Sequence, residues 1–216
     1  MSETNPFQKS PVLIIQFAKW PQAGRVKTRL VPALGEQGAM EAHICLSLQV
    51  LDNLSKSGYP LQLWWDRPLD QPPIEAQSLL AKLSLVGAEQ CFQSGENLGE
   101  RMSRALAEGL TQYPRVIIVG SDCPSVNAGY IDEALLALEQ NDVVLGPSDD
   151  GGYVLIGTRK VVPDMLANIQ WGTDRALAET VERLTENKLT VALLETRWDV
   201  DEPDDWQRFL RESPGF

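Results

Sequence analysis

The order of apolar and polar residues predicts strands and helices along most of the chain. Two near-continuous apolar runs, residues 12–18 (VLIIQFA) and 115–120 (RVIIVG), predict buried strands. Residues 98–110 place apolar side chains three or four positions apart, which is typical of an amphipathic helix. Thr173 is the expected cap of a later helix. The same patterns predict further strands at residues 61–65, 88–92, 142–146, 152–158 and 189–194, and further helices at residues 37–57, 128–138, 173–187 and 203–211.

Strands and helices alternate through the first two thirds of the sequence. This alternation predicts an α/β fold with a mostly parallel sheet that helices cover on both faces. We expect a single domain over residues 1–216, with a core at about residues 11–212 and flexible ends at residues 1–10 and 213–216. Ligands of such folds bind outside the carboxyl ends of the strands, so we expect functional residues in the loops that follow the strands.

The composition argues against several classes of protein. The formal net charge of −11 disfavours binding to nucleic acid and to anionic membranes. Three cysteines without a CxxC spacing indicate free thiols in a reducing compartment. No apolar stretch approaches the ~20 residues that span a bilayer, so we expect a cytoplasmic protein. The one histidine, His43, lies in a predicted helix and is expected to be packed or solvated and not catalytic.

Four basic residues lie within a short loop after the first predicted strand. Lys19, Arg25, Lys27 and Arg29 stand out against the acidic background, and Gly24 among them permits close approach of the backbone. Lys and Arg side chains, together with backbone N–H groups, suit a pyrophosphate. The loop is therefore predicted to bind phosphate, although it is not a GxxxxGKS or GxxxxGKT motif; the alternative is a solvated basic loop.

A single acidic residue, Asp122, stands in the turn Gly-Ser-Asp-Cys-Pro after another predicted strand. Mg²⁺ and Mn²⁺ favour carboxylates combined with substrate phosphates, so Asp122 is a candidate metal ligand. The alternative is a residue that caps a helix or forms the turn. Cys123 beside it is interpreted as a packing residue, because no histidine lies near it in sequence to activate the thiol.

Two further segments are rich in acidic residues. Five of the seven residues 199–205 are acidic, and such clustering is unfavourable unless a cation or basic groups lie close. The alternative is an exposed turn in which Asp201 caps the last helix. Residues 146–153 join two predicted strands and contain Asp149 and Asp150, either of which could contact an acceptor or a sugar. Here the alternative is a plain glycine-rich hairpin turn.

Five segments in order resemble a known family. FAKWPQAGRVKTRL, GENLGERM, GSDCP, GPSDDGGYVLIG and WDVDEPDDW are similar to segments of the glycosyltransferase-A-like (GT-A) bacterial proteins called DUF2064. Some of these are described as arsenosugar-biosynthesis glycosyltransferases. The resemblance extends from about residue 12 to residue 209, and more distantly to molybdopterin and phospholactate nucleotidyltransferases. It implies a single-domain GT-A fold of the nucleotide-diphospho-sugar transferase superfamily, with a mixed, mostly parallel sheet.

The resemblance also implies roles for individual residues. Asp122 matches the position of a metal-binding Asp-x-Asp motif, of which only one Asp is present here. Asp201 is the best second ligand of a divalent Mg²⁺ or Mn²⁺ ion, with Asp199 as the alternative, and we expect Asp122 and Asp201 to lie close enough to share it. Lys27 and Arg29 match phosphate-contacting positions and should face the same cleft. Three further residues are expected near the base and ribose of the donor: Gly95, Asn97 and Arg101.

Three functions are compatible with these features. The first is transfer of a glycosyl group from a nucleotide sugar to a small-molecule acceptor, with Asp150 or Asp149 as the base. The second is nucleotidyl transfer from a nucleoside triphosphate (NTP) with release of pyrophosphate. The third is nucleotide binding without catalysis. The resemblance favours the first. Among the tryptophans, Trp171 is the first candidate for stacking on a sugar or base. The donor base, the acceptor and the oligomeric state are not predicted.

Overall fold

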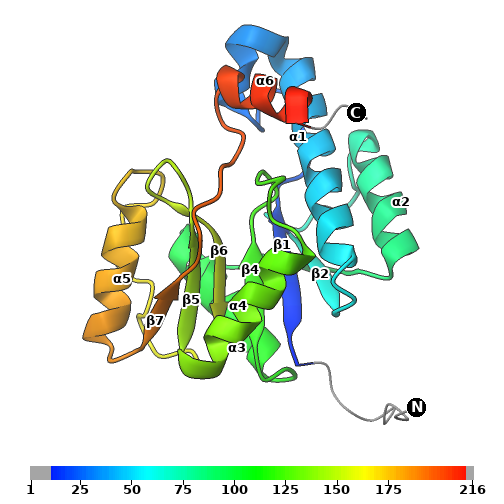
Figure 1. The fold of residues 1–216 in the computed structure, drawn as a ribbon. Helices are drawn as coiled ribbons and strands as arrows, with labels where there is room; N and C mark the ends of the chain where they lie inside the picture. The colour runs from blue at the N-terminus through cyan, green and yellow to red at the C-terminus, as the bar shows by residue number, and fades with distance from the viewer. Residues whose placement is uncertain (1–10, 213–216) are drawn as a thin grey trace.

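A computed structural model describes residues 11–212, and a seven-stranded sheet forms its centre (Figure 1). The ends that we expect to be flexible, residues 1–10 and 213–216, lie outside the described residues. Across the sheet the strands follow the order β3-β2-β1-β4-β6-β5-β7. Their bounds are β1 Leu13–Ala18, β2 Leu61–Trp65, β3 Glu89–Phe92, β4 Val116–Val119, β5 Val143–Pro147, β6 Tyr153–Thr158 and β7 Val191–Leu193.

The sheet is mixed, because β6 runs antiparallel to its neighbours β4 and β5 while the other adjacent pairs are parallel. Ala18 at the end of β1 pairs with Trp65 at the end of β2, and Trp65 pairs with Phe92 at the end of β3. Val119 at the end of β4 pairs with Gln16 of β1. The loops that follow these four strands therefore leave from one edge, which we call the carboxyl edge. The predicted mixed, mostly parallel α/β fold is confirmed.

Helices cover both faces of the sheet, as predicted. Their bounds are α1 Val31–Ser55, α2 Gln77–Val86, α3 Leu98–Leu110, α4 Ala128–Gln140, α5 Ala176–Glu186 and α6 Pro203–Glu212, with 3-10 turns at Thr28–Leu30 and Ile74–Ala76. The helices α1, α2 and α4 pack on the face that contains Ile14 and Ile117, whereas α3 and α5 pack on the face that contains Ile15 and Ile118. Successive strand residues point to opposite faces, and both faces are buried. This explains why β1 and β4 are apolar at almost every position.

One helix begins earlier than predicted, and another was not predicted. The α1 helix begins at Val31, inside the segment predicted as a loop, and it includes a kink at Gly35, where φ is 70°. The α2 helix was not predicted, because it follows a proline-rich loop and its apolar face is short. Its buried residues are Leu79 and Leu83. None of the helices in residues 11–212 has both the length and the apolarity needed to cross a bilayer.

The expected cap at Thr173 is wrong. The α5 helix begins only after Arg175, and no side chain caps it. The hydroxyl of Thr173 donates a hydrogen bond to the carbonyl oxygen of Gln170 at 2.8 Å and accepts one from the backbone N–H of Arg175 at 3.3 Å. Both bonds belong to the turn that precedes the helix.

The last helix, α6, lies apart from the sheet and beside the beginning of α1 (Figure 1). After β7 the chain crosses the carboxyl edge, and we call this crossing segment, residues 194–202, the strap. Val200 of the strap and Phe209 of α6 are fully buried against Leu46 of α1. This small core anchors the end of the strap above the carboxyl edge of the sheet.

Candidate functional site

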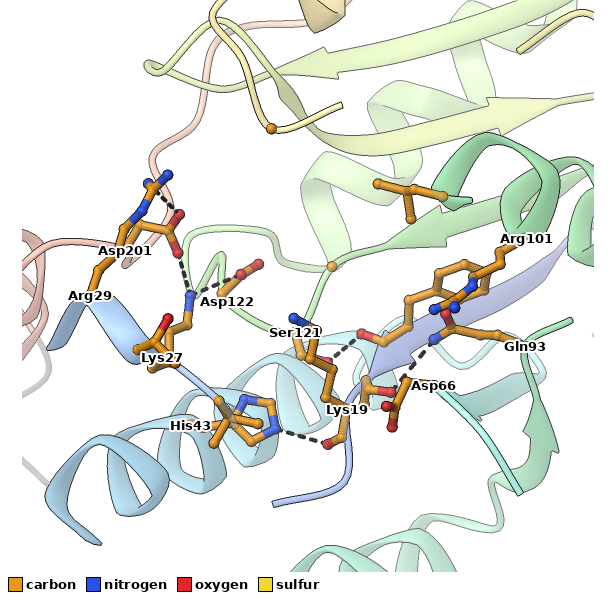
Figure 2. A pocket seen from close by; sticks show the side chains of 17 residues that line it. Lys19, Lys27, Arg29, His43, Asp66, Gln93, Arg101, Ser121, Asp122 and Asp201 are labelled. Carbon is orange, nitrogen blue, oxygen red and sulfur yellow. Dashed lines mark hydrogen bonds and ion pairs between the residues drawn. The ribbon is translucent and has the colours of Figure 1, made fainter. Parts of the chain in front are cut away.

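The loops at the carboxyl edge surround a cavity of about 530 Å³, which we call the first cavity (Figure 2). Segments that are far apart in sequence contribute to it, because their strands end side by side: one loop follows β1, another follows β4, and the strap crosses above them. Six residues predicted from the sequence line this cavity: Lys19, Lys27, Arg29, Arg101, Asp122 and Asp201.

Lys27 is the buried centre of the site. Its ammonium group donates hydrogen bonds to Asp122 Oδ2 at 2.9 Å and to Asp201 Oδ1 at 2.7 Å (Figure 2). Its side chain is only 7% exposed. Burial by itself lowers the pKa of Lys27, but the two carboxylates outweigh this effect and raise the pKa above its ordinary value. Lys27 is therefore charged and joins the turn after β4 to the strap.

The backbone at Lys27 adopts the left-handed conformation, with φ 45° and ψ 45°. For a residue other than glycine this conformation costs about 1–3 kcal/mol and persists only where the surroundings hold it. Here the two ion pairs hold the side chain, and the 3-10 turn that follows is anchored by Leu30, which is fully buried. The conformation turns the Lys27 side chain into the cavity.

Arg29 lies at the rim of the same cluster. Its guanidinium donates to Asp201 Oδ2 at 3.2 Å. The side chain of Arg29 is 57% exposed, so this ion pair contributes at most about 1 kcal/mol. The guanidinium of Arg29 is therefore more exposed than the ammonium of Lys27, although both line the first cavity.

Two hydrogen bonds hold the strap against the turn that contains Asp122. The backbone N–H of Val200 donates to the carbonyl oxygen of Asp122 at 3.0 Å. The thiol of Cys123 donates to the carbonyl oxygen of Trp198 at 3.0 Å. Burial raises the pKa of the Cys123 thiol to about 12, so this sulfur stays protonated. Cys123 is fully buried, which agrees with its interpretation as a packing residue.

Asp205, and not Asp201, accepts hydrogen bonds from the backbone N–H groups at the start of α6. The Asp205 carboxylate accepts hydrogen bonds from the backbone N–H groups of Glu202 at 2.8 Å and Asp201 at 3.2 Å. This is the backward half of a capping box, in which an acidic side chain in the first turn reaches back to the residues before it. The Asp201 carboxylate is therefore directed to Lys27 and Arg29 instead of to the helix.

Three carboxylates gather beside Lys27. Asp122, Asp199 and Asp201 each offer an oxygen, and these oxygens all lie within 4.8 Å of one another. Burial, followed by the charges of Asp122, Asp150 and Asp201, raises the pKa of Asp199 to about 7. The pKa of Asp122 shifts in the opposite direction. Burial acts to raise this pKa, but the adjacent Lys27 lowers it below its ordinary value.

This cluster has the chemistry of a site for a hard divalent cation. Mg²⁺ and Mn²⁺ prefer carboxylate oxygens, and two or three carboxylates with substrate phosphates complete their coordination. Lys27 and the exposed Arg29 bring two positive charges to three carboxylates, so one negative charge of the cluster has no basic partner among them. A divalent ion between Asp122, Asp199 and Asp201 would supply the missing charge.

His43 lines the first cavity, a position that the sequence did not predict. Its Nε2 lies 2.9 Å from the carbonyl oxygen of Lys19 (Figure 2). A carbonyl can only accept, so Nε2 carries the proton and Nδ1 of the neutral ring is an acceptor. Burial lowers the pKa of His43, which keeps the ring neutral. The expectation of a packed histidine agrees with its 5% exposure, but its position in the cavity wall was missed.

Three more polar residues of the cavity were missed. Asp66 accepts a hydrogen bond from the backbone N–H of Trp20 at 2.9 Å, Gln93 donates to the carbonyl oxygen of Trp64 at 2.9 Å, and Ser121 donates to the carbonyl oxygen of Phe17 at 2.5 Å. A signal was present in the sequence, because Asp66 and Gln93 each come directly after a predicted strand.

Four residues predicted for the nucleotide site lie outside the lining of the first cavity. Arg25 lines a separate pocket on the surface, and Gly24 (φ 73°) shapes the turn before it. Asn97 is the N-cap of α3, where its side chain accepts from the backbone N–H of Glu100 at 3.0 Å. The carbonyl oxygen of Gly95 accepts from Arg101 Nε at 3.1 Å. Gly95 and Asn97 therefore position Arg101 and its helix.

A second cavity of about 150 Å³ adjoins the first, because Leu98 and Gly172 line both, and Asp199 lies in its wall. The segment between β5 and β6 is a hairpin turn, as its alternative interpretation proposed, because these strands pair antiparallel. Asp150 of this turn lines the second cavity. Asp149 lies outside its lining, and its backbone N–H donates to the carbonyl oxygen of Arg197 at 3.2 Å. Trp171 also lines the second cavity.

Residues 51–173 match the model of a family described as "Uncharacterized protein conserved in bacteria (DUF2064)". The comparison with curated proteins gives no match. Among solved structures, the chain is similar to a candidate nucleotide-diphospho-sugar transferase from Desulfovibrio desulfuricans G20. The two sequences are 31% identical, the TM-score is 0.85, and the alignment covers 95% of this chain and 89% of the other.

Two more distant structures share the fold alone. One is CMP:2-keto-3-deoxy-manno-octonic acid synthetase complexed with CTP, with 11% identity, a TM-score of 0.59, and coverage of 95% of this chain and 99% of the other. The second is Rv0371c from Mycobacterium tuberculosis H37Rv in complex with manganese, with 19% identity, a TM-score of 0.53, and coverage of 94% and 97%.

Proposed function

This chain belongs to the DUF2064 family of bacterial proteins, and from that membership we propose that it is a metal-dependent glycosyltransferase with a nucleotide-diphospho-sugar donor. The observation that supports this most is Lys27, buried between Asp122 and Asp201 in the wall of the first cavity. Together with the exposed Arg29 and the third carboxylate, Asp199, this arrangement provides the positive groups and the cation ligands that a diphosphate requires.

In the proposed chemistry the leaving group, the nucleoside diphosphate, lies beside the basic residues of the first cavity. Lys27 and Arg29 bind the diphosphate, and Lys19 and Arg101 supply further positive charge to the same cavity. A bound Mg²⁺ or Mn²⁺, held by Asp122 with Asp201 or Asp199, would add a Lewis acid at the phosphate oxygens. As the bond between the anomeric carbon and the diphosphate oxygen breaks, negative charge moves onto the diphosphate, where the fixed cations stabilise it.

Asp150 is the proposed base on the acceptor side. It lines the second cavity, whereas Asp149 of the same turn does not. The Asp150 carboxylate is held by hydrogen bonds from the hydroxyl of Ser148 and from the backbone N–H of Gly152. In the proposed step the acceptor oxygen bonds to the anomeric carbon and its proton moves to Asp150. The acceptor is a small molecule with a hydroxyl or similar group.

Nucleotidyl transfer is the second candidate function. In that reaction the same cations hold a nucleoside triphosphate while a substrate phosphate attacks its α-phosphorus and pyrophosphate leaves. The likeness of the fold to the synthetase complexed with CTP favours this alternative. The third possibility, nucleotide binding without catalysis, is weakened by the presence of both the basic and the acidic residues in one cavity.

Thermal stabilisation by a panel of ligands separates these functions. A ligand that binds the folded protein raises its stability by RT ln(1 + [L]/Kd). The panel contains nucleotide sugars, nucleoside triphosphates and nucleoside diphosphates, each with Mn²⁺, with Mg²⁺ and with EDTA. A metal-dependent rise in the melting temperature with nucleotide sugars supports glycosyl transfer. A rise confined to triphosphates, with release of pyrophosphate on turnover, supports nucleotidyl transfer. If no nucleotide raises the melting temperature, the proposal is contradicted.

A further inference from the structure

The second cavity differs from the first in charge, and this difference bears on what the protein transfers. The first cavity has four basic residues in its lining. Among the described residues that line the second cavity there is no Lys or Arg, and two carboxylates, Asp150 and Asp199, are present. A phosphate or carboxylate placed there would meet the like charge of Asp150 with no Lys or Arg in the lining to compensate it. The second cavity therefore suits a neutral group.

One wall of the second cavity is aromatic. Trp171 meets Tyr153 edge to face, with 6.1 Å between ring centroids and an interplanar angle of 77°. Gly99 of α3 allows this packing, because a Cβ at that position would lie 2.4 Å from the carbonyl oxygen of Leu166 and 3.0 Å from the Trp171 ring. Trp171 is thus held in place by the helix behind it and can serve as a rigid platform for the apolar face of a ring.

Polar groups also line the second cavity. Asp150, Ser148 and Thr173 line the same cavity. A carboxylate has about four lone-pair sites, so Asp150 keeps acceptor capacity beyond its two hydrogen bonds within the turn. The cavity is also smaller than the ~300–1,000 Å³ typical of sites for drug-sized ligands, which suits one ring and not a whole nucleotide.

We propose that the second cavity is the subsite for the transferred glycosyl group, that Trp171 is its stacking platform, and that it selects neutral, hydroxylated rings against rings that bear an anionic group. This inference rests on the proposed function, because it takes the diphosphate to lie at Lys27. A group bonded to that diphosphate would extend past the carboxylate cluster, and Asp199 is common to the cluster and to the second cavity. A phosphate-bearing substrate would not be accepted there.

The platform is tested by comparing two ligands on three proteins. Calorimetry with Mn²⁺ measures the dissociation constants of UDP and UDP-glucose for the wild type, Trp171→Phe and Trp171→Ala. If the ligand panel identifies another base, its nucleoside diphosphate and the corresponding nucleotide hexose (the hexose ester) replace them. We expect Trp171→Ala to weaken the hexose ester about tenfold, Trp171→Phe less than about threefold, and both to leave the diphosphate within about twofold. Circular dichroism checks the fold of each variant.

Charge selection is tested with a second pair of probes, UDP-glucose and UDP-glucuronate, which differ by one carboxylate on the ring. We expect the wild type to bind the neutral sugar at least about tenfold more tightly, and Asp150→Asn to reduce this ratio. This inference is overturned if the wild type binds UDP-glucose and UDP-glucuronate equally tightly, or if Trp171→Ala weakens the binding of the diphosphate and of the hexose ester equally. Either result leaves the proposed function standing. Failure of the wild type to bind any nucleoside diphosphate overturns both.

Discussion

Replacing Asp199 by Asn tests whether burial and the charges of the neighbouring carboxylates destabilise the ionised Asp199 in the metal-free protein. Burial and the neighbouring carboxylates raise the pKa of Asp199 from 3.8 to about 7. A pKa difference of one corresponds to about 1.4 kcal/mol, so the ionised carboxylate lowers the free energy of unfolding by up to about 4 kcal/mol. The side chain is partly exposed and solvent screens its charge, so we expect Asp199→Asn to stabilise the metal-free protein by about 2 kcal/mol.

The pH dependence of this gain follows from the raised pKa. Between about pH 4 and pH 7 the folded protein binds the Asp199 proton more tightly than the unfolded chain does. The stability that this proton provides is therefore lost as the pH rises through about 7. Asp199→Asn does not titrate in this window, so its advantage over the wild type is small at about pH 4 and reaches its full size above about pH 7.

Urea unfolding in EDTA at about pH 5 and about pH 8 measures the effect, and we expect less than half of the gain at the lower pH. Asp149→Asn is the matched control, because Asp149 is exposed in a neighbouring turn, and it should change stability by no more than about 0.5 kcal/mol at either pH. With Mn²⁺ the wild type should become more stable than Asp199→Asn, because only the wild type keeps the Asp199 carboxylate as a third metal ligand. A gain in stability that is absent, or equal at both pH values, would refute the proposed destabilisation of the ionised Asp199.

Three further substitutions test the remaining parts of the site. Asp122→Ala should abolish the stabilisation by Mn²⁺ and nucleotide in thermal scans while the circular dichroism spectrum of the free protein stays unchanged. Lys27→Ala leaves Asp122 without a basic partner and Asp201 with only the exposed Arg29, so the free energy of unfolding in urea should fall by about 3 kcal/mol in EDTA, and Mn²⁺ should restore more stability than in the wild type. Gly99→Ala places a methyl group against Leu166 and Trp171, and we expect a loss of about 1–3 kcal/mol with weaker binding of the hexose ester than of the diphosphate in calorimetry.

The α/β class could be predicted from sequence because strands such as β1 and β4 are apolar runs bounded by loops, whereas the order of the strands across the sheet was not predicted. Because ligands of such folds bind outside the carboxyl ends of the strands, Lys27 and Asp122 could be expected at the same edge of the sheet. The resemblance to the family added Asp201 from the end of the chain. The α2 helix escaped prediction because its buried stripe is short. His43 escaped it because its helix brings the ring beneath the loop after β1, a contact that no local pattern contains.

The choice among the basic residues of one loop could not be made from sequence. Arg25 and Lys27 are two positions apart, yet only Lys27 faces the first cavity, because the left-handed backbone at Lys27 turns its side chain inward. Asn97 is a different case. It stands three residues before Glu100, a spacing typical of a capping box, so its role as a helix cap was readable from the sequence.

Anomalous diffraction from crystals grown with Mn²⁺ and a nucleoside diphosphate locates the proposed metal and diphosphate in a single measurement. We expect one strong manganese peak within about 2.5 Å of carboxylate oxygens of Asp122 and at least one of Asp199 and Asp201. The diphosphate should complete the coordination of the ion and contact Lys27. A manganese ion away from these carboxylates, or a diphosphate bound away from Lys27, would contradict this expectation.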